Sequence, residues 1–96
     1  MKPSELLEQH REEVRRIALS RGVSSVRVFG SVLHGTDTEG SDLDLLVEPT
    51  AQTSMFDIGG IQFEVSELLG IDVDVVTPRA LHESFRQQVL AEATLL

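Results

Sequence analysis

The sequence contains no cysteine, and only eight Lys and Arg residues stand against sixteen Asp and Glu residues. The missing thiols exclude disulfides, thiolate zinc sites and cysteine catalysis. A formal net charge of −8 argues against a nucleic-acid-binding protein, because neutralising phosphates requires a basic surface. It does not exclude a nucleotide bound through metal ions, since the cations then supply the positive charge. An acidic surface also suits docking on a basic protein partner.

The sequence also lacks long apolar runs. No stretch approaches the about 20 residues that a membrane span needs, and the charged opening MKPSELLEQHREEV is unlike a signal peptide. We therefore expect a cytoplasmic protein that does not bind membranes. A length of 96 residues, 41% of them hydrophobic and 25% charged, predicts one folded domain over residues 1–96.

The pattern of apolar residues predicts alternating helices and strands. We expect helices over residues 4–21, 31–35, 54–69 and 78–90, and strands over residues 24–29, 42–48 and 71–77. Ser4 and Ser54 are expected to cap their helices, and Gly22 to end the first one. Gly59 and Gly60 weaken the helix that contains them, and they either permit close packing or mark a kink.

The resulting order, α-β-α-β-α-β-α, predicts a small α/β fold. Three strands form its sheet, and we expect the helices to lie on one side of that sheet. The final residues, AEATLL, are expected to form a loose tail or a docking segment.

Two of the expected strands carry paired aspartates. Successive side chains of a strand alternate between its faces, so Asp42 and Asp44 share a face, with Cα atoms about 7 Å apart. Asp72 and Asp74 repeat this spacing in the strand of residues 71–77. If the two strands are neighbours, one acid of the second pair faces the first pair, and three carboxylates converge.

Converging carboxylates repel one another, and burial penalises their charge further. Such a cluster is tolerable if it is protonated, exposed to solvent or bound to cations. Hard oxygen ligands select Mg²⁺ or Mn²⁺. Two such ions about 3.5–4 Å apart are suited to in-line displacement at phosphorus. The acids therefore indicate a two-metal site for phosphoryl chemistry.

A glycine-serine pair follows the first expected strand. Gly30 lets the backbone approach a phosphate closely, and Ser31 offers a hydroxyl and an N–H group at a helix N-terminus. Gly35 closes the turn. Alone, G-S-x-x-x-G is a weak signal, because both glycines could be ordinary turn residues. With S-D-x-D and a third acidic strand after it, the motif predicts a site for nucleotide phosphates.

Together, GSVLHG, SDLDLLV and VDVVT resemble the signature of the polymerase-β-type nucleotidyltransferases. The chain is most similar to the minimal nucleotidyltransferases, the antitoxins of MNT/HEPN toxin–antitoxin pairs, and the resemblance covers nearly its whole length. It implies a small mixed three-stranded sheet of the nucleotidyltransferase fold. It also implies that Asp42, Asp44 and Asp74 are catalytic metal ligands and that Gly30 and Ser31 hold nucleotide phosphates.

This resemblance implies transfer of AMP from ATP to an acceptor hydroxyl, with two Mg²⁺ ions, or Mn²⁺, as cofactors. For the minimal antitoxins the implied acceptor is a tyrosine of a HEPN-family RNase toxin, which is thereby neutralised. The alternative is an antitoxin that neutralises its toxin by binding alone. We expect a hetero-oligomer with the toxin and no direct binding of nucleic acid. Transfer to a small molecule such as an aminoglycoside is disfavoured, because no segment is left to form an antibiotic pocket.

Two positions depart from the family pattern. Asp72 is an extra acid where the family has no ligand, so the choice between Asp72 and Asp74 stays open, with Asp74 favoured. His34 stands where members often carry arginine, and a neutral imidazole would hold phosphate less firmly. An EF-hand interpretation of residues 37–48 fails, because its sixth position is Asp42, where the loop needs glycine.

Overall fold

The computed structural model describes all 96 residues of the chain. Helices and strands follow one another in the order α1 (Pro3–Ser20), β1 (Ser25–Phe29), α2 (Gly30–His34), β2 (Leu43–Glu48), α3 (Met55–Leu69), β3 (Val73–Val76), η1 (Pro78–Ala80), α4 (Glu83–Glu92) and β4 (Thr94–Leu95). The element η1 is a single 3-10 turn. The three expected strands are confirmed within two residues at each end.

One mixed sheet organises the molecule, with the strand order β3-β2-β1-β4. Strands β2 and β3 run parallel, whereas β1 runs antiparallel to both β2 and β4. The fourth strand differs from the expected three. Thr94 pairs with Val28, and the backbone N–H of Leu96 donates to the carbonyl of Val26 at 3.2 Å. The last residues are therefore an edge strand rather than a loose tail.

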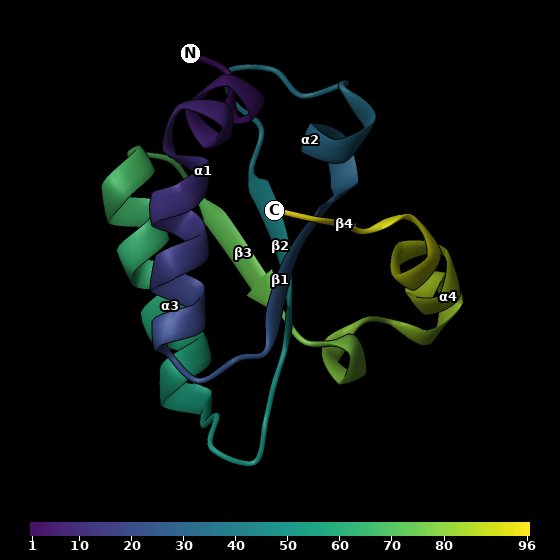
Figure 1. Cartoon of the computed structure of the whole chain (residues 1–96). Coiled ribbons are helices and arrows are strands. Elements are labelled where there is room, and N and C mark those ends of the chain that lie inside the picture. Colours follow the sequence, from purple (N-terminus) through teal and green to yellow (C-terminus); the bar gives the residue numbers. More distant parts are fainter.

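The sheet has a well-packed face and a more open one. Leu43, Leu45 and Val47 are completely buried, and they belong to one apolar core with residues of α1 and α3. Leu46 points to the other face, where η1 contacts β2. Figure 1 shows α1 and α3 on one side of the strands and α4 on the other. The expectation that the helices cover one side thus holds only for α1 and α3.

Helix starts agree with the sequence in one case and differ in two. Ser54 caps α3 as expected, because its hydroxyl accepts a hydrogen bond from Asp57 N at 3.2 Å. The expectation for Ser4 is wrong, since α1 begins at Pro3, whose ring fixes φ for a first helical turn. The helix expected from residue 78 begins only at Glu83, after the η1 turn and a short extended segment.

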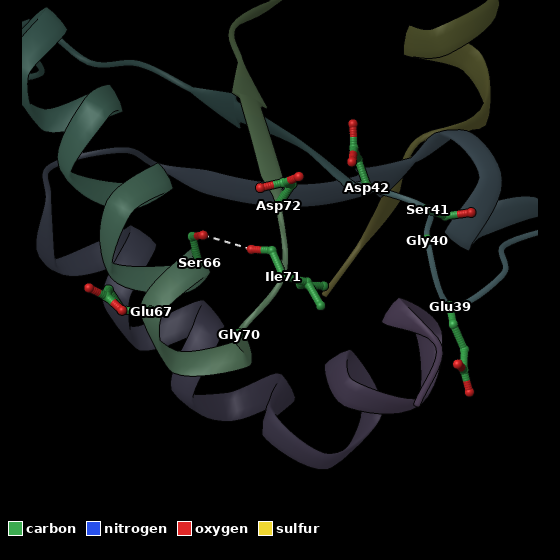
Figure 2. A pocket seen from close by; sticks show the side chains of 9 residues that line it. All are labelled: Glu39, Gly40, Ser41, Asp42, Ser66, Glu67, Gly70, Ile71 and Asp72. Atoms are coloured by element: carbon green, nitrogen blue, oxygen red, sulfur yellow. Dashed lines mark hydrogen bonds between the residues drawn. The ribbon is translucent and has the colours of Figure 1, made fainter.

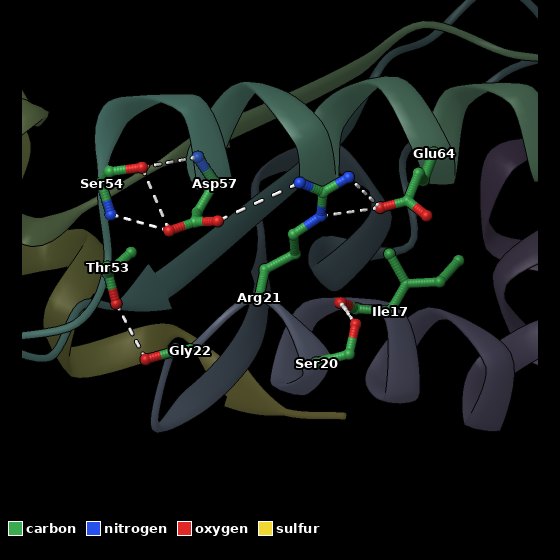
Figure 3. A network of polar contacts seen from close by, with 8 residues as sticks. All are labelled: Ile17, Ser20, Arg21, Gly22, Thr53, Ser54, Asp57 and Glu64. Atoms are coloured by element: carbon green, nitrogen blue, oxygen red, sulfur yellow. Dashed lines mark hydrogen bonds and ion pairs between the residues drawn. The ribbon is translucent and has the colours of Figure 1, made fainter.

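The packing of α3 on α1 explains one of the two mid-helix glycines (Figure 3). The guanidinium of Arg21 donates to Glu64 at 2.9 Å and lies 4.0 Å from the Asp57 carboxylate. A Cβ atom on Gly60 would lie 2.5 Å from Arg21 Cζ, so Gly60 permits this close packing. The kink in the fold lies at His10 of α1, where φ is −123°. None of the helices combines the length and hydrophobicity that a membrane span requires.

Candidate functional site

The parallel pairing of β2 with β3 brings the aspartates of these strands together. In this register Asp44 stands opposite Asp74, and Leu43 stands opposite Val73. Asp42 directly precedes β2 and is exposed to solvent, as is Asp74, whereas Asp44 is half-buried. The condition that the sequence left open, that the two strands are neighbours, is met. Asp74 is the residue that faces Asp44.

The charge of this acid cluster is not compensated within the chain. Burial, followed by the negative charges of Asp74 and Asp42, raises the pKa of Asp44 to about 6. None of the ion pairs in the structure includes any of these three acids. A group of carboxylates with mutual repulsion and no cationic side chain in contact provides the electrostatic setting in which a bound cation would be stabilised.

Three carboxylates are also the donor set that Mg²⁺ and Mn²⁺ prefer, so the side chains fit the implied metals in their chemistry. The ligand set is not preassembled, because no three His, Cys, Asp or Glu side chains are arranged closely enough to hold a metal ion. Asp42 and Asp74 are exposed, so their side chains can change rotamer without repacking the core. A cation would therefore have to draw these carboxylates together.

The Gly30–Ser31 segment lies against the acid cluster. Gly30 has a φ of +74°, and a Cβ atom at this position would overlap the Asp44 carboxylate oxygen Oδ2. Glycine is thus required here both by the backbone conformation and by the approach of Asp44. Ser31 follows in the first turn of α2 and is partly buried. The geometry places the expected phosphate loop directly beside an expected metal ligand.

Two shallow hollows adjoin the acids on the β3 side of the sheet. One has a volume of about 610 Å³ and lies between α3 and β3, with Asp42, Gly59, Phe63 and Asp74 among its lining residues. The second, of about 440 Å³, is lined by Glu39, Gly40, Ser41, Asp42, Ser66, Glu67, Gly70, Ile71 and Asp72 (Figure 2). Asp42 lines both, so the two hollows are neighbours.

The fourth aspartate, Asp72, occupies a different position from Asp74. Its side chain is exposed and lines both hollows, and its carbonyl accepts a hydrogen bond from Leu43 N at 3.0 Å. The charges that raise the pKa of Asp44 are those of Asp74 and Asp42, with no contribution from Asp72. This difference favours Asp74 as the third member of the cluster.

Asp37 is a buried polar residue of the loop between α2 and β2, and sequence reasoning missed it. It is buried, with 6% of its surface exposed, and it accepts a hydrogen bond from Ser4 N at 2.8 Å. Burial alone would raise the pKa of Asp37, but hydrogen bonds from the backbone and hydroxyl of Ser4, a hydrogen bond from its own backbone and the charge of Lys2 together outweigh burial and lower that pKa. This contact fastens the loop before Asp42 to the start of α1. No local pattern signals it, because the partners are 33 positions apart.

His34 ends α2 and contacts the C-terminal part of the chain. Its Nε2 atom lies 2.9 Å from the Glu92 carboxylate of α4, and both side chains are partly exposed. The contact connects the segment after the phosphate loop with the end of α4. An imidazole engaged with a carboxylate is less available to a phosphate than an unengaged one would be.

The chain is similar to known proteins over most of its length. The family model of the nucleotidyltransferase domain matches residues 7–96. A solved structure of a proposed minimal nucleotidyltransferase is 41% identical, with a TM-score of 0.86 over 97% of this chain and 95% of that chain. The protein adenylyltransferase MntA of Thermococcus cleftensis is 32% identical over 87 residues, covering 91% of this chain and 85% of MntA. A chain of the MntA–HepT toxin–antitoxin structure shares the fold at 20% identity, with a TM-score of 0.63 over 95% of this chain and 69% of its own length.

Proposed function

The chain belongs to the nucleotidyltransferase domain family, and from this premise we propose that it transfers AMP from ATP to a tyrosine of a HEPN-type toxin and thereby acts as an antitoxin. The observation that carries the proposal is the register pairing of Asp44 with Asp74 beside Gly30. Asp42 completes the cluster, whose charge has no cationic partner in the chain. Such a site is suited to a metal-bound triphosphate and poorly suited to an anion alone.

Each part of the site has a role in this reaction. Asp42, Asp44 and Asp74 would hold the metal ions. Mg²⁺, when bound, would neutralise triphosphate charge and make the acceptor hydroxyl more acidic. Backbone N–H groups at Gly30 and Ser31 would bind phosphate oxygens and fix the orientation of the triphosphate.

The chemical step exchanges the phosphoanhydride bond of ATP for a phosphodiester bond to the acceptor. The acceptor oxygen forms a bond to the α-phosphorus of ATP, and the bond from that phosphorus to the bridging oxygen of pyrophosphate breaks. The exposed Asp74 carboxylate would accept the proton that leaves the acceptor hydroxyl. Pyrophosphate would be the leaving group, and metal ions held by the three aspartates would neutralise its charge.

The acceptor must be supplied by another protein. The chain contains no tyrosine, so a tyrosine acceptor cannot be its own. The similar protein MntA is named a protein adenylyltransferase, and the solved MntA–HepT pair is a toxin–antitoxin complex. A net charge of −8 also suits docking on a basic partner. These findings support a protein acceptor of the toxin type.

A transfer assay tests the proposal directly. The chain would be incubated with Mg²⁺, a HEPN-type toxin as the acceptor, and ATP labelled at the α-phosphate. We expect label in the partner, located to a tyrosine by mass spectrometry, and none when Asp44→Asn replaces the wild-type chain. If Asp44→Asn neutralises the partner's RNase activity at the same stoichiometry as the wild type, inhibition works by binding and the catalytic proposal is wrong.

A further inference from the structure

The outward face of α3 carries two exposed phenylalanines. Phe56 is 89% exposed and Phe63 is 65% exposed. Seven residues, or about two helical turns, separate them, so they project from the same side of the helix, opposite the buried Ile61 and Val65. A helix with apolar side chains on both faces is typical of a surface that contacts another molecule.

Only one of these two phenylalanines reaches the hollow beside the acids. Phe63 lines the space between α3 and β3 together with Asp42 and Asp74, whereas Phe56 does not. Gly59 lies one turn before Phe63 and lines the same space, and a Cβ atom there would meet nothing within 4 Å. The hollow therefore has an aromatic wall at Phe63 and an opening at Gly59.

The α3–β3 spacing that forms this hollow is fixed by a side chain. Gln62 of α3 accepts a hydrogen bond from the backbone N–H of Val75 at 3.1 Å, on the edge of β3 that no strand covers. Neighbouring Ser66 donates to the carbonyl of Ile71 at 2.6 Å (Figure 2). The two bonds hold the helix against the strand before any ligand is present.

The order of the strands decides which substrate this hollow would receive. Gly30 and Ser31 follow β1, so the phosphate loop lies on the β1 side of Asp44. Asp74 and the hollow lie on the opposite side, towards β3. In-line transfer requires the attacking and leaving oxygens on opposite sides of the phosphorus. When a triphosphate is held at the β1 side, the β3 side therefore remains free for the acceptor.

We propose that the hollow between α3 and β3 is the acceptor subsite, and that Phe63 packs against the ring of the acceptor tyrosine while Gly59 leaves room for it. This inference rests on the proposed function. The occupant is a tyrosine-bearing segment of a basic partner protein, because acids and no Lys or Arg line the hollow. A second copy of the chain is a poor occupant, since it would bring its own net charge of −8 against these acids.

The two phenylalanines provide a matched pair for the test. Phe63→Ala and Phe56→Ala each remove one exposed ring from α3, but only the ring of Phe63 lines the hollow. With the HEPN-type partner as acceptor, we expect Phe63→Ala to raise the KM for the partner about tenfold, as expected for a lost aromatic pair with its buried area. The KM for ATP should stay unchanged. Phe56→Ala should change the KM for the partner less than about twofold.

A substitution that fills the hollow makes the complementary test. Gly59→Leu places its side chain in open space and improves the helix propensity of α3, so the fold should persist. We expect it to abolish transfer to the partner while Mg·ATP binding, measured by calorimetry, equals that of the wild type.

Different results separate this inference from the function on which it rests. Absence of transfer by the wild-type chain overturns the proposed function and the acceptor subsite with it. Transfer by the wild type that Gly59→Leu leaves intact, or equal effects of Phe63→Ala and Phe56→Ala, overturns the subsite alone. A loss of Mg·ATP binding in Phe63→Ala shows that the hollow holds the nucleotide. If light scattering shows a wild-type dimer that Phe63→Ala dissociates, a second copy of the chain covers the hollow, and the acceptor subsite is overturned.

Discussion

Replacing Asp44 with asparagine should stabilise the metal-free protein near neutral pH. The folded state raises the pKa of Asp44 from its ordinary 3.8 to about 6. Between these values the folded chain holds a proton that the unfolded chain has released, so stability falls as the pH rises through this window. If the whole pKa shift of Asp44 is converted into free energy of unfolding, it amounts to about 3 kcal/mol. Because Asp44 is only half-buried and water screens the charges of its neighbours, we expect Asp44→Asn to raise the free energy of unfolding by only about 1 kcal/mol.

The assay is thermal and urea denaturation in EDTA from pH 4 to pH 8. At pH 7 the Asp44→Asn variant should unfold about 4–8 °C above the wild type, as 1 kcal/mol implies for a domain of this size. The difference should shrink towards pH 4. Asp72→Asn is the control, because Asp72 does not contribute to the shifted pKa of Asp44. The reasoning is refuted if Asp44→Asn is less stable than the wild type at pH 7, or if the two stability profiles run parallel.

Three further substitutions test the surroundings of the site. Gly30→Ala should cost about 1–3 kcal/mol in urea denaturation, because its φ is +74° and its Cβ would overlap the Asp44 carboxylate. Asp37→Ala should cost about 1–3 kcal/mol by leaving Ser4 N unpaired. Since the pKa of Asp37 is lowered, its contribution is present above about pH 4 and should vanish as the pH falls below that. Gly59→Ala should stabilise α3 by about 0.5–1 kcal/mol, because the new methyl group meets no atom.

Each of these expectations has its own control. Gly40→Ala adds a methyl group in open space without a positive φ, so equal losses for it and Gly30→Ala would contradict the account of Gly30. For Asp37, Glu39→Ala alters an exposed acid of the same loop and should leave stability unchanged. Gly60→Ala must displace the Arg21 guanidinium, so it should not match the gain of Gly59→Ala.

The structural features that the sequence predicted correctly are those that depend on short-range patterns of residues. Period-two alternation located β2 and β3, and it placed Asp42 and Asp44 on one face before their partner strand was known. Ser54 was identified as a cap because serine before an apolar helix is a local signal. The mixed sheet agreed in class with the family resemblance, although it has one more strand than expected.

The features that were missed depend on contacts between distant residues. Strand β4 has two residues, too few to show any alternation, and it forms only because β1 offers a free edge. Asp37 with Ser4, and His34 with Glu92, are contacts across 33 and 58 positions that no spacing rule reveals. The late start of α4 likewise reflects tertiary structure.

Arg86 accounts for that late start. It donates to the carbonyls of Pro78 and Leu81 at 3.1 and 2.8 Å and thereby holds the turn that precedes α4. Pro78, the first residue of the expected helix, opens only a single 3-10 turn.

The central claim is that Asp74 joins Asp42 and Asp44 in binding metal and nucleotide. The most direct test is calorimetric titration of Mg·ATP into the wild type, Asp74→Asn and Asp72→Asn. The two variants differ only in which exposed acid of the same chain segment is neutralised. We expect Asp72→Asn to bind like the wild type and Asp74→Asn to lose binding. Binding that survives in Asp74→Asn but is lost in Asp72→Asn would contradict the account.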